Sequence, residues 1–243
     1  MYNGSVIKSA TRFDKKEIND VASYLRELLH LNSNNKRVLF RGQADESFPL
    51  VPSIGREKEG KPIYDLDDEH RIFLEFKKRY YSFTNCRPTS DADLLFLAQH
   101  HELPTRLLDW TYNPLIALYF ACLSHEDMDG AIYTISIDDN SKSIKEGHEL
   151  DDCILDSSKY KQDYYFIIPD DTHVRYVHQS GMFILFKNPT NPIANLNASF
   201  IIKNKKLILE ELAYIGITDS FVLPTLDNLC KEIKRSIKNN NNL

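Results

Sequence analysis

The chain has 243 residues, of which 42% are hydrophobic and 27% are charged, a composition that is ordinary for a globular protein. This composition excludes disordered, collagen-like and fibrous classes. The net charge of -5 argues against nucleic-acid binding through bulk electrostatic attraction, which needs a strong positive field. The length suits one large domain or two small ones.

The cysteines and the apolar runs indicate the cellular location to expect for the protein. Its 4 cysteines are scattered and form no C-x-x-C pair, which fits a reducing cytoplasm. The N-terminal stretch MYNGSVIKSATRFDKK lacks the apolar core of a signal peptide, and the run LIALYFACL is too short to cross a bilayer. We therefore expect a cytoplasmic protein with no membrane partner.

The first part of the chain predicts a helix, a strand and a long loop. Asp14 and Glu17 have the spacing of a capping box, and apolar residues then repeat at helical spacing to Leu29. The run RVLFRGQ, residues 37–43, predicts a strand with Arg41 near its end. Residues 44–65 are rich in Pro and Gly and predict a loop, and loops of this length are often functional.

Two helices and an extended segment are predicted next. Acidic residues open a helix over 66–83, and Ser90 caps a second one that runs to the histidines at 100 and 101. Pro104 ends it, and TRLLDW, residues 105–110, predicts an extended segment.

The helix that follows, residues 114–122, has no polar face and should be buried on nearly all sides. Its first N–H groups then need partners inside the protein, or a bound anion. We expect Asp109, Asn113 and Pro114 to form the entrance to this helix, with Asn113 as its cap.

The second half is richer in strands. The runs 130–137, 164–168, 182–186 and 199–203 predict a largely antiparallel sheet, and two helices follow, one through Tyr214 and one after Pro224. The predicted fold is one α+β domain with a helical first half and a mostly antiparallel sheet in the second half.

The common catalytic motifs are absent from the sequence, including Walker A, G-x-G-x-x-G, H-E-x-x-H and G-x-S-x-G. His100 and His101 are adjacent and would point about 100° apart on a helix, so no metal site is expected there. One histidine should pack or cap the helix end while the other faces a cleft. Arg106 is expected to hold a carboxylate or a phosphate, and Trp110 to lie in the core or in a pocket wall.

Four segments resemble the FRG domain family. They are LFRGQ (39–43), AQHHELPTRLLDWTYNPLIALYFA (98–121), RYVHQSGMF (175–183) and GITDSFVLPTLDNL (216–229). This resemblance implies a helical extension at residues 1–37, an FRG domain at 38–238 and a disordered tail at 239–243. The family is widespread and largely microbial, and it has no firmly assigned activity.

The order of the segments is also similar to that of arginine-type ADP-ribosyltransferases. Arg41 ends the first strand, and Thr111 precedes a helix with the pattern A-x-x-F. The similarity implies an ADP-ribosyltransferase-like fold in which Arg41 holds the pyrophosphate of NAD, Thr111 orients a neighbouring group, and Trp110 or Tyr112 walls the nicotinamide site.

The late segment of the chain departs from the transferase pattern. It offers Arg175, His178 and Gln179 where the transferases carry a catalytic Glu. Asp109 or Glu102 then takes this role, the chemistry differs, or the pocket only binds its ligand.

Twelve residues form the predicted site. The catalytic candidates are Arg41, His101, Asp109, Thr111 and Gln179. The ligand-binding candidates are Gln43, Gln99, His100, Arg106, Trp110, Asn113 and Arg175.

The expected ligand is a nucleotide such as NAD, or another anionic small molecule, and no metal is expected. As an enzyme, the protein would cleave the glycosidic bond of NAD, or transfer ADP-ribose to a macromolecular acceptor, as an effector in microbial defence. The alternative is a non-catalytic module that binds nucleic acid or a protein and uses the same residues as structural caps.

Overall fold

The structure is a computed structural model that describes residues 15–31, 37–137, 144–146, 149, 154–168, 181–193, 196 and 198–240. The predicted site residues Arg175 and Gln179 lie outside these residues, as does His178. Of the predicted tail at 239–243, the first two residues belong to the last helix and the others are outside the described part. Within the described ranges, no helix has the length and apolar character needed to cross a membrane.

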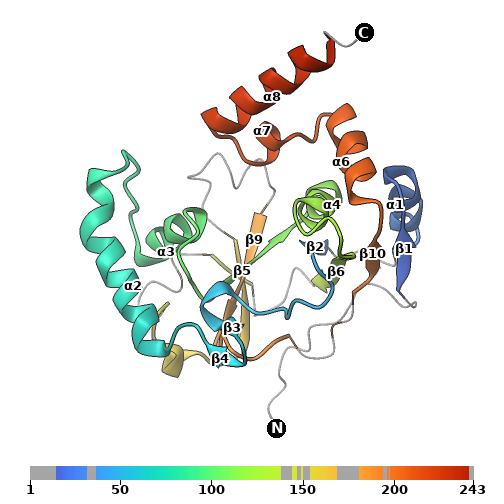
Figure 1. Cartoon of the computed structure of the whole chain (residues 1–243). Helices are drawn as coiled ribbons and strands as arrows, with labels where there is room; N and C mark the ends of the chain where they lie inside the picture. The colour runs from blue at the N-terminus through green and yellow to red at the C-terminus, as the bar shows by residue number, and fades with distance from the viewer. Residues whose placement is uncertain are drawn as a thin grey trace.

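One mixed sheet dominates the architecture (Figure 1). Its strands, in spatial order, are β1 (Lys16–Ile18), β10 (Phe200–Ile202), β6 (Gly130–Ile137), β2 (Arg37–Gln43), β5 (Leu107–Thr111), β9 (Gly181–Phe186), β8 (Tyr164–Ile168) and β7 (Ile144–Glu146). The β1–β10 and β7–β8 pairs are parallel, and all other neighbours are antiparallel. The predicted α+β fold with a mostly antiparallel sheet is confirmed. Two of its central strands, β2 and β5, nevertheless come from the first half of the chain.

Helices cover the sheet in two groups. They are α1 (Val21–Leu28), α2 (Leu66–Arg79), α3 (Asp91–His100), α4 (Pro114–Cys122), α6 (Lys205–Tyr214), α7 (Asp219–Val222) and α8 (Leu226–Asn240). In Figure 1, α1, α4 and α6 lie on one side of the molecule, α2 and α3 lie on the other, and α8 extends away from the body. The long predicted loop contains a short 3₁₀ turn, η1 (Ser53–Gly55), and a small hairpin of β3 (Glu57–Lys58) and β4 (Lys61–Pro62).

The predicted start of the first helix is wrong. Residues Lys16–Ile18 form the edge strand β1, and the helix begins only at Val21. Its capping box consists of Asp20 and Ser23: the Ser23 backbone N–H donates to the Asp20 carboxylate over 2.6 Å, and the Asp20 N–H donates to the Ser23 hydroxyl over 3.3 Å. Ile18 is fully buried, so this segment packs into the same core as the later strands.

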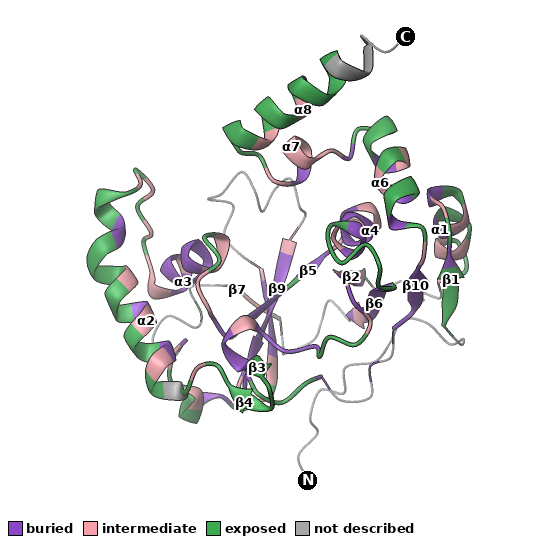
Figure 2. Ribbon diagram, viewed as in Figure 1, coloured by how far each residue is buried: buried purple, intermediate pink, exposed green. Residues whose placement is uncertain are grey.

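Three hydrophobic clusters form the core. The first lies between α1, α4, α6 and the β1–β10–β6–β2 half of the sheet. Another lies between α2, α3 and the β5–β9–β8 half. The third is built from the opposite face of the strands, with Leu39, Leu108, Tyr133 and Ile184 among its members, and no described helix contributes to it. Figure 2 shows α4 as almost wholly buried, as its sequence predicted.

A seam separates the two halves of the sheet. Strand β2 pairs with β6 along its whole length, and β5 pairs with β9 along its whole length. Between β2 and β5, in contrast, the only described residue pair is Phe40 with Thr111. Beyond this pair the two strands diverge, and the residues after Phe40 on β2 and before Thr111 on β5 line a space between them.

Candidate functional site

A cavity of about 770 Å³ opens where β2 and β5 diverge. Strand β2 contributes Arg41 and Gln43 to its lining, and β5 contributes Asp109, Trp110 and Thr111. Helix α4 closes one side, the loop around η1 closes another, and the end of α3 supplies the remaining wall. The walls of this cavity therefore come from five elements, which lie in two stretches of the chain, residues 40–57 and 99–124.

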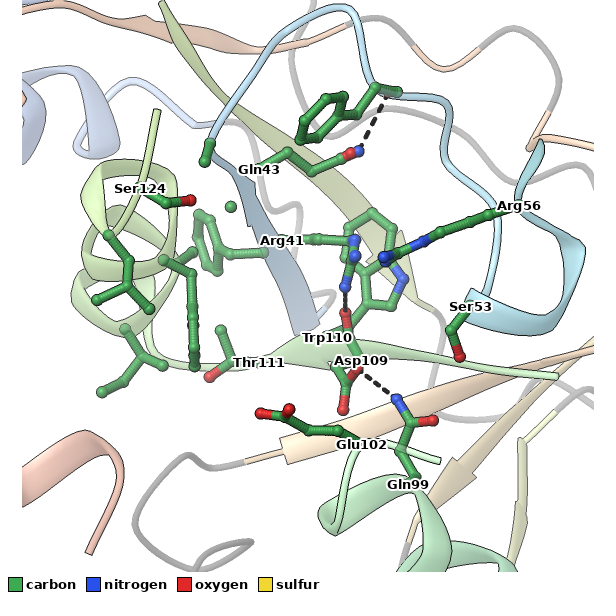
Figure 3. A pocket seen from close by; sticks show the side chains of 18 of the residues that line it. Arg41, Gln43, Ser53, Arg56, Gln99, Glu102, Asp109, Trp110, Thr111 and Ser124 are labelled. Carbon is green, nitrogen blue, oxygen red and sulfur yellow. Dashed lines mark hydrogen bonds between the residues drawn. The ribbon is translucent and has the colours of Figure 1, made fainter. Parts of the chain in front are cut away.

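Two arginines converge in the cavity. Figure 3 shows the guanidinium groups of Arg41 and Arg56 pointing toward each other beside the indole of Trp110. Arg41 Nη1 donates to the backbone carbonyl of Asp109 over 2.7 Å and so bridges the diverging strands. Desolvation, opposed by the charge of Asp109 and assisted by the charge of Arg56, lowers the pKa of Arg41 from 12.5 to about 10. Neither arginine forms an ion pair with a carboxylate of the described residues, and two such cations close together favour an anion.

The floor of the cavity holds buried polar atoms without a partner in the described part of the protein. Trp110 is 2% exposed, and its indole Nε1 has no hydrogen-bond acceptor there. Gln43 is 6% exposed and donates from Nε2 to the Phe48 carbonyl over 3.2 Å, which leaves its Oε1 without a donor. Arg41 Nε is also buried and has no hydrogen-bond acceptor among the described residues. An unpaired buried polar group costs about 1–3 kcal/mol, and a ligand that pairs with these atoms would recover that cost.

Asp109 is oriented by a chain of side chains. Gln99 Nε2 donates to the Asp109 carboxylate over 2.8 Å, and Gln99 Oε1 accepts from the hydroxyl of Thr105. Asp109 itself is exposed between buried neighbours in β5, so its carboxylate faces the cavity. This arrangement fixes one carboxylate opposite the two arginines.

The predicted role of Asp109 at the entrance of α4 is wrong. Asn113 caps that helix, because its Oδ1 accepts from the Leu115 N–H over 2.9 Å, and Pro114 is the first helical residue. Thr111 orients this cap, since its hydroxyl accepts from the Asn113 N–H over 2.9 Å. Asn113 is therefore a structural residue and does not line the cavity.

Glu102 lines the cavity from an unusual backbone position. It has a φ of 62°, in the left-handed region, directly after the C-cap of α3. The Leu103 N–H donates to the Ala98 carbonyl over 3.0 Å, and the Glu102 N–H donates to the Gln99 carbonyl over 3.0 Å, which together make a Schellman motif. Glycine is the usual residue at this position, so a glutamate here carries backbone strain of about 1 kcal/mol.

The structure does not bring Arg106 to the cavity. Its guanidinium is 3% exposed and forms a two-point ion pair with the equally buried Glu69 of α2, with Arg106 Nε 2.7 Å from one Glu69 oxygen. Arg106 does hold a carboxylate, as predicted, but this carboxylate belongs to the core. The pair fastens α2 to the residue that precedes β5.

The predicted histidines also lie outside the cavity. His100 ends α3 and His101 is its C-cap, and their rings contact each other edge to face at 4.9 Å. Neither residue lines the cavity. In the described ranges, no group of three or more His, Cys, Asp or Glu residues could hold a metal ion.

Arg56 is the main site residue that the sequence did not identify. It follows η1 in the long loop. The length of this loop predicted a functional segment but did not indicate which of its residues is involved. Hydrogen bonds anchor the loop to the start of β5: Thr105 N–H donates to the Ser53 hydroxyl over 3.1 Å, and the Ile54 N–H donates to the Thr105 carbonyl over 3.2 Å. No periodicity or motif in the sequence signals this contact, because it joins residues about fifty positions apart.

These features define a mixed α/β domain whose sheet parts at its centre around a cationic, partly acidic pocket. Comparison with known families agrees with the motifs that build this pocket. Residues 36–130 match the family model of the FRG domain, and this segment contains two of the motifs that resemble that family.

The matched segment contains every described residue that lines the cavity. It also contains the first two motifs of the resemblance, whereas the motifs at 175–183 and 216–229 lie beyond it. The domain boundary at residue 238 stays a prediction. No curated protein matches the chain, and no solved structure matches it either.

Proposed function

We propose that the cavity binds a nucleotide with a pyrophosphate, with NAD as the substrate, and that the protein cleaves its glycosidic bond or transfers its ADP-ribose. The observation that carries this proposal is the convergence of Arg41 and Arg56 over the buried indole of Trp110. Two guanidinium groups suit two adjacent phosphates, and an aromatic wall suits a flat base.

Four side chains of the cavity would contact the nucleotide. Arg41 and Arg56 bind the pyrophosphate by charge-assisted hydrogen bonds. The Trp110 N–H donates to a ligand oxygen, and Gln43 Oε1 accepts from a hydroxyl or an amide of the ligand. In this proposal the two arginines bind the charged part of the dinucleotide, and Trp110 and Gln43 bind its neutral parts.

The proposed reaction breaks the bond between the nicotinamide nitrogen and the anomeric carbon of ribose. The electron pair of this bond leaves with nicotinamide, and a carboxylate stabilises the positive charge that develops on the ribose. Water, or a nucleophile of a macromolecular acceptor, attacks the anomeric carbon and loses a proton. Three acids line the cavity, Glu57, Glu102 and Asp109, and we assign this role to Asp109 or Glu102. We place the reaction in the cytoplasm and, by analogy, in microbial defence.

Removal of Arg41 tests the binding of the nucleotide. We expect NAD and ADP-ribose to raise the Tm of the wild-type protein in a thermal-shift assay, because a ligand of the native state stabilises it. Arg41→Gln should weaken this binding about 10–100-fold, since a charged hydrogen bond contributes about 1.5–3 kcal/mol. Arg71→Gln is the matched control, because Arg71 lies on the exposed surface of α2.

Equal binding to the Arg41→Gln and Arg71→Gln proteins would contradict the proposal. A salt-dependent shift with oligonucleotides, together with no shift from NAD or ADP-ribose, would instead support the nucleic-acid-binding alternative.

Alkaline pH should weaken the binding of the anion. The pKa of Arg41 is lowered to about 10 by desolvation, so the guanidinium is charged at neutral pH and loses its proton as the pH rises through that value. Affinity for ADP-ribose should therefore be constant up to about pH 9 and fall toward tenfold per pH unit above about pH 10. Calorimetric titrations of the wild type and Arg41→Gln measure this, with circular dichroism to show that both stay folded. A parallel decline in both proteins would show that Arg41 is not the titrating group.

Two substitutions identify the reacting carboxylate. Glu102→Gly should raise the free energy of unfolding by about 1 kcal/mol, because glycine relieves the strain at a φ of 62°. If Glu102 stabilises the ribose cation, the same variant should lose at least about 100-fold in the rate of nicotinamide release and keep its affinity for ADP-ribose. Asp109→Asn makes the matching test for the second acid, and normal turnover by both variants would refute the catalytic part of the proposal.

A further inference from the structure

Helix α8 is attached to the body by its polar face. Three of its residues at helical spacing make the contacts: Asn228 Nδ2 donates to the Leu223 carbonyl over 2.9 Å, Glu232 accepts from the Ser220 hydroxyl, and Arg235 Nη1 lies 3.3 Å from the Asp219 carboxylate. Residues i, i+4 and i+7 share one face of a helix. These directional contacts fix the rotation of α8 about its own axis.

The apolar face of α8 consequently points to solvent. It consists of Leu226, Leu229, Cys230, Ile233 and Ile237, which we call the α8 stripe. Leu226 is 75% exposed, Ile233 is 48% exposed and Ile237 is 56% exposed. Figure 2 shows α8 as mostly exposed and standing away from the body. A surface helix normally turns its apolar stripe to the core, so the reversed orientation indicates an external partner.

The spacing of the stripe suits packing against a second helix. Leu226, Cys230, Ile233 and Ile237 are separated by four, three and four residues, which is the alternation of a coiled-coil seam. The charged residues beside the α8 stripe determine what kind of helix can pack against it. Asp227 and Lys234 are seven residues apart and therefore lie on the same flank of α8.

This flank is complementary to a second copy of itself. When two α8 helices pack antiparallel about a twofold axis near Cys230, each Asp227 meets Lys234 of the other copy, which gives two symmetrical ion pairs. In a parallel pair this flank would instead lie beside the opposite flank of the other copy, which carries Leu229 and Ser236, and no such ion pair would form. We propose that the α8 stripe is the interface of an antiparallel homodimer of this protein.

The dimer should be weak and dependent on concentration. A standard interface buries about 800 Å² on each partner, and the stripe of a single helix of this length offers less. We therefore expect a dissociation constant in the micromolar range. Sedimentation velocity from low micromolar to several hundred micromolar protein should show a monomer that converts to a dimer.

Substitutions in the stripe and on its flank test the interface. Ile233→Glu should raise the dissociation constant at least tenfold, whereas Leu29→Glu, at the 85% exposed C-cap of α1, should leave it unchanged. Lys234→Asp should also weaken the dimer, because two acids then face each other on each side. Adding Asp227→Lys to this variant should restore the wild-type value.

The charge reversals keep the test valid if Ile233→Glu disturbs α8, because their positions are exposed and make no described contact with the body. A wild type that stays monomeric at every concentration would overturn the proposal. Equal weakening by Leu29→Glu, or no recovery in the double charge reversal, would overturn it as well.

Discussion

Glu69→Ala should lower the free energy of unfolding by about 3–5 kcal/mol, which corresponds to a fall in Tm of roughly 6–20 °C for a chain of this size. The reason is the charge that the substitution leaves behind. Arg106 and Glu69 are both almost fully buried and pair through two hydrogen bonds, so the loss of one partner leaves the other charged and desolvated in the core. Chemical denaturation of the purified variants measures the effect.

A double variant distinguishes the cost of leaving one buried charge unpaired from the contribution of the ion pair to stability. Glu69→Leu with Arg106→Met removes both charges and should be more stable than either Glu69→Ala or Arg106→Ala. The matched control is Lys78→Ala, which removes an exposed ion pair with Glu75 and should cost less than about 0.5 kcal/mol. If Arg106→Ala costs no more than this control, Arg106 does not fasten α2 to β5.

Gly42→Ala should cost at least about 3 kcal/mol and should also close part of the cavity. A Cβ atom at Gly42 would lie 1.9 Å from the Ala117 carbonyl oxygen and 2.7 Å from the Ala121 nitrogen, both in the backbone of α4. Backbone atoms of a buried helix cannot turn away as a side chain can, so α4 must move off β2. Because α4 walls the cavity, ligand affinity should fall together with stability.

Gly60 provides the comparison for this substitution. It lies in the exposed β3–β4 hairpin with a φ of 73°, and a Cβ there would meet nothing within 4 Å. Gly60→Ala should therefore cost only about 1 kcal/mol, from backbone strain alone. Equal losses for the two variants in urea denaturation would show that the close approach of α4 to β2 is not what requires Gly42.

Much of the fold follows from local patterns in the sequence. The runs at 37–43, 130–137 and 164–168 are strands with the predicted bounds, and Ser90 and Asn113 cap the predicted helices. These features depend on alternation, capping and turn residues within a few positions, which a single sequence displays. The first helix was placed too early because β1 is only three residues long, and its pairing partner β10 lies far along the chain.

The residues that line the cavity could be predicted only in part from the sequence. Arg41, Gln43, Gln99, Asp109, Trp110 and Thr111 line the cavity as expected. Their roles as ligand-binding or catalytic groups stay predictions. Arg106 and the two histidines are expected there because they belong to the same polar segment. The histidines, however, lie at the end of α3, and Arg106 points to the opposite face from the lining residues. The partner of Arg106 is Glu69, thirty-seven positions away, and no local pattern connects them.

The seam between β2 and β5 has a mechanical consequence. One ladder pair, Phe40 with Thr111, and the hydrogen bond from Arg41 to the Asp109 carbonyl join two half-sheets, each of which has its own hydrogen-bonded ladders and its own covering helices. We therefore expect that the two halves can rotate slightly about this pair without breaking a ladder in either one. The width of the cavity depends on this angle, so a substitution beneath α2 or α6 that tilts one half would change ligand affinity from a distance, with no change to any residue of the lining.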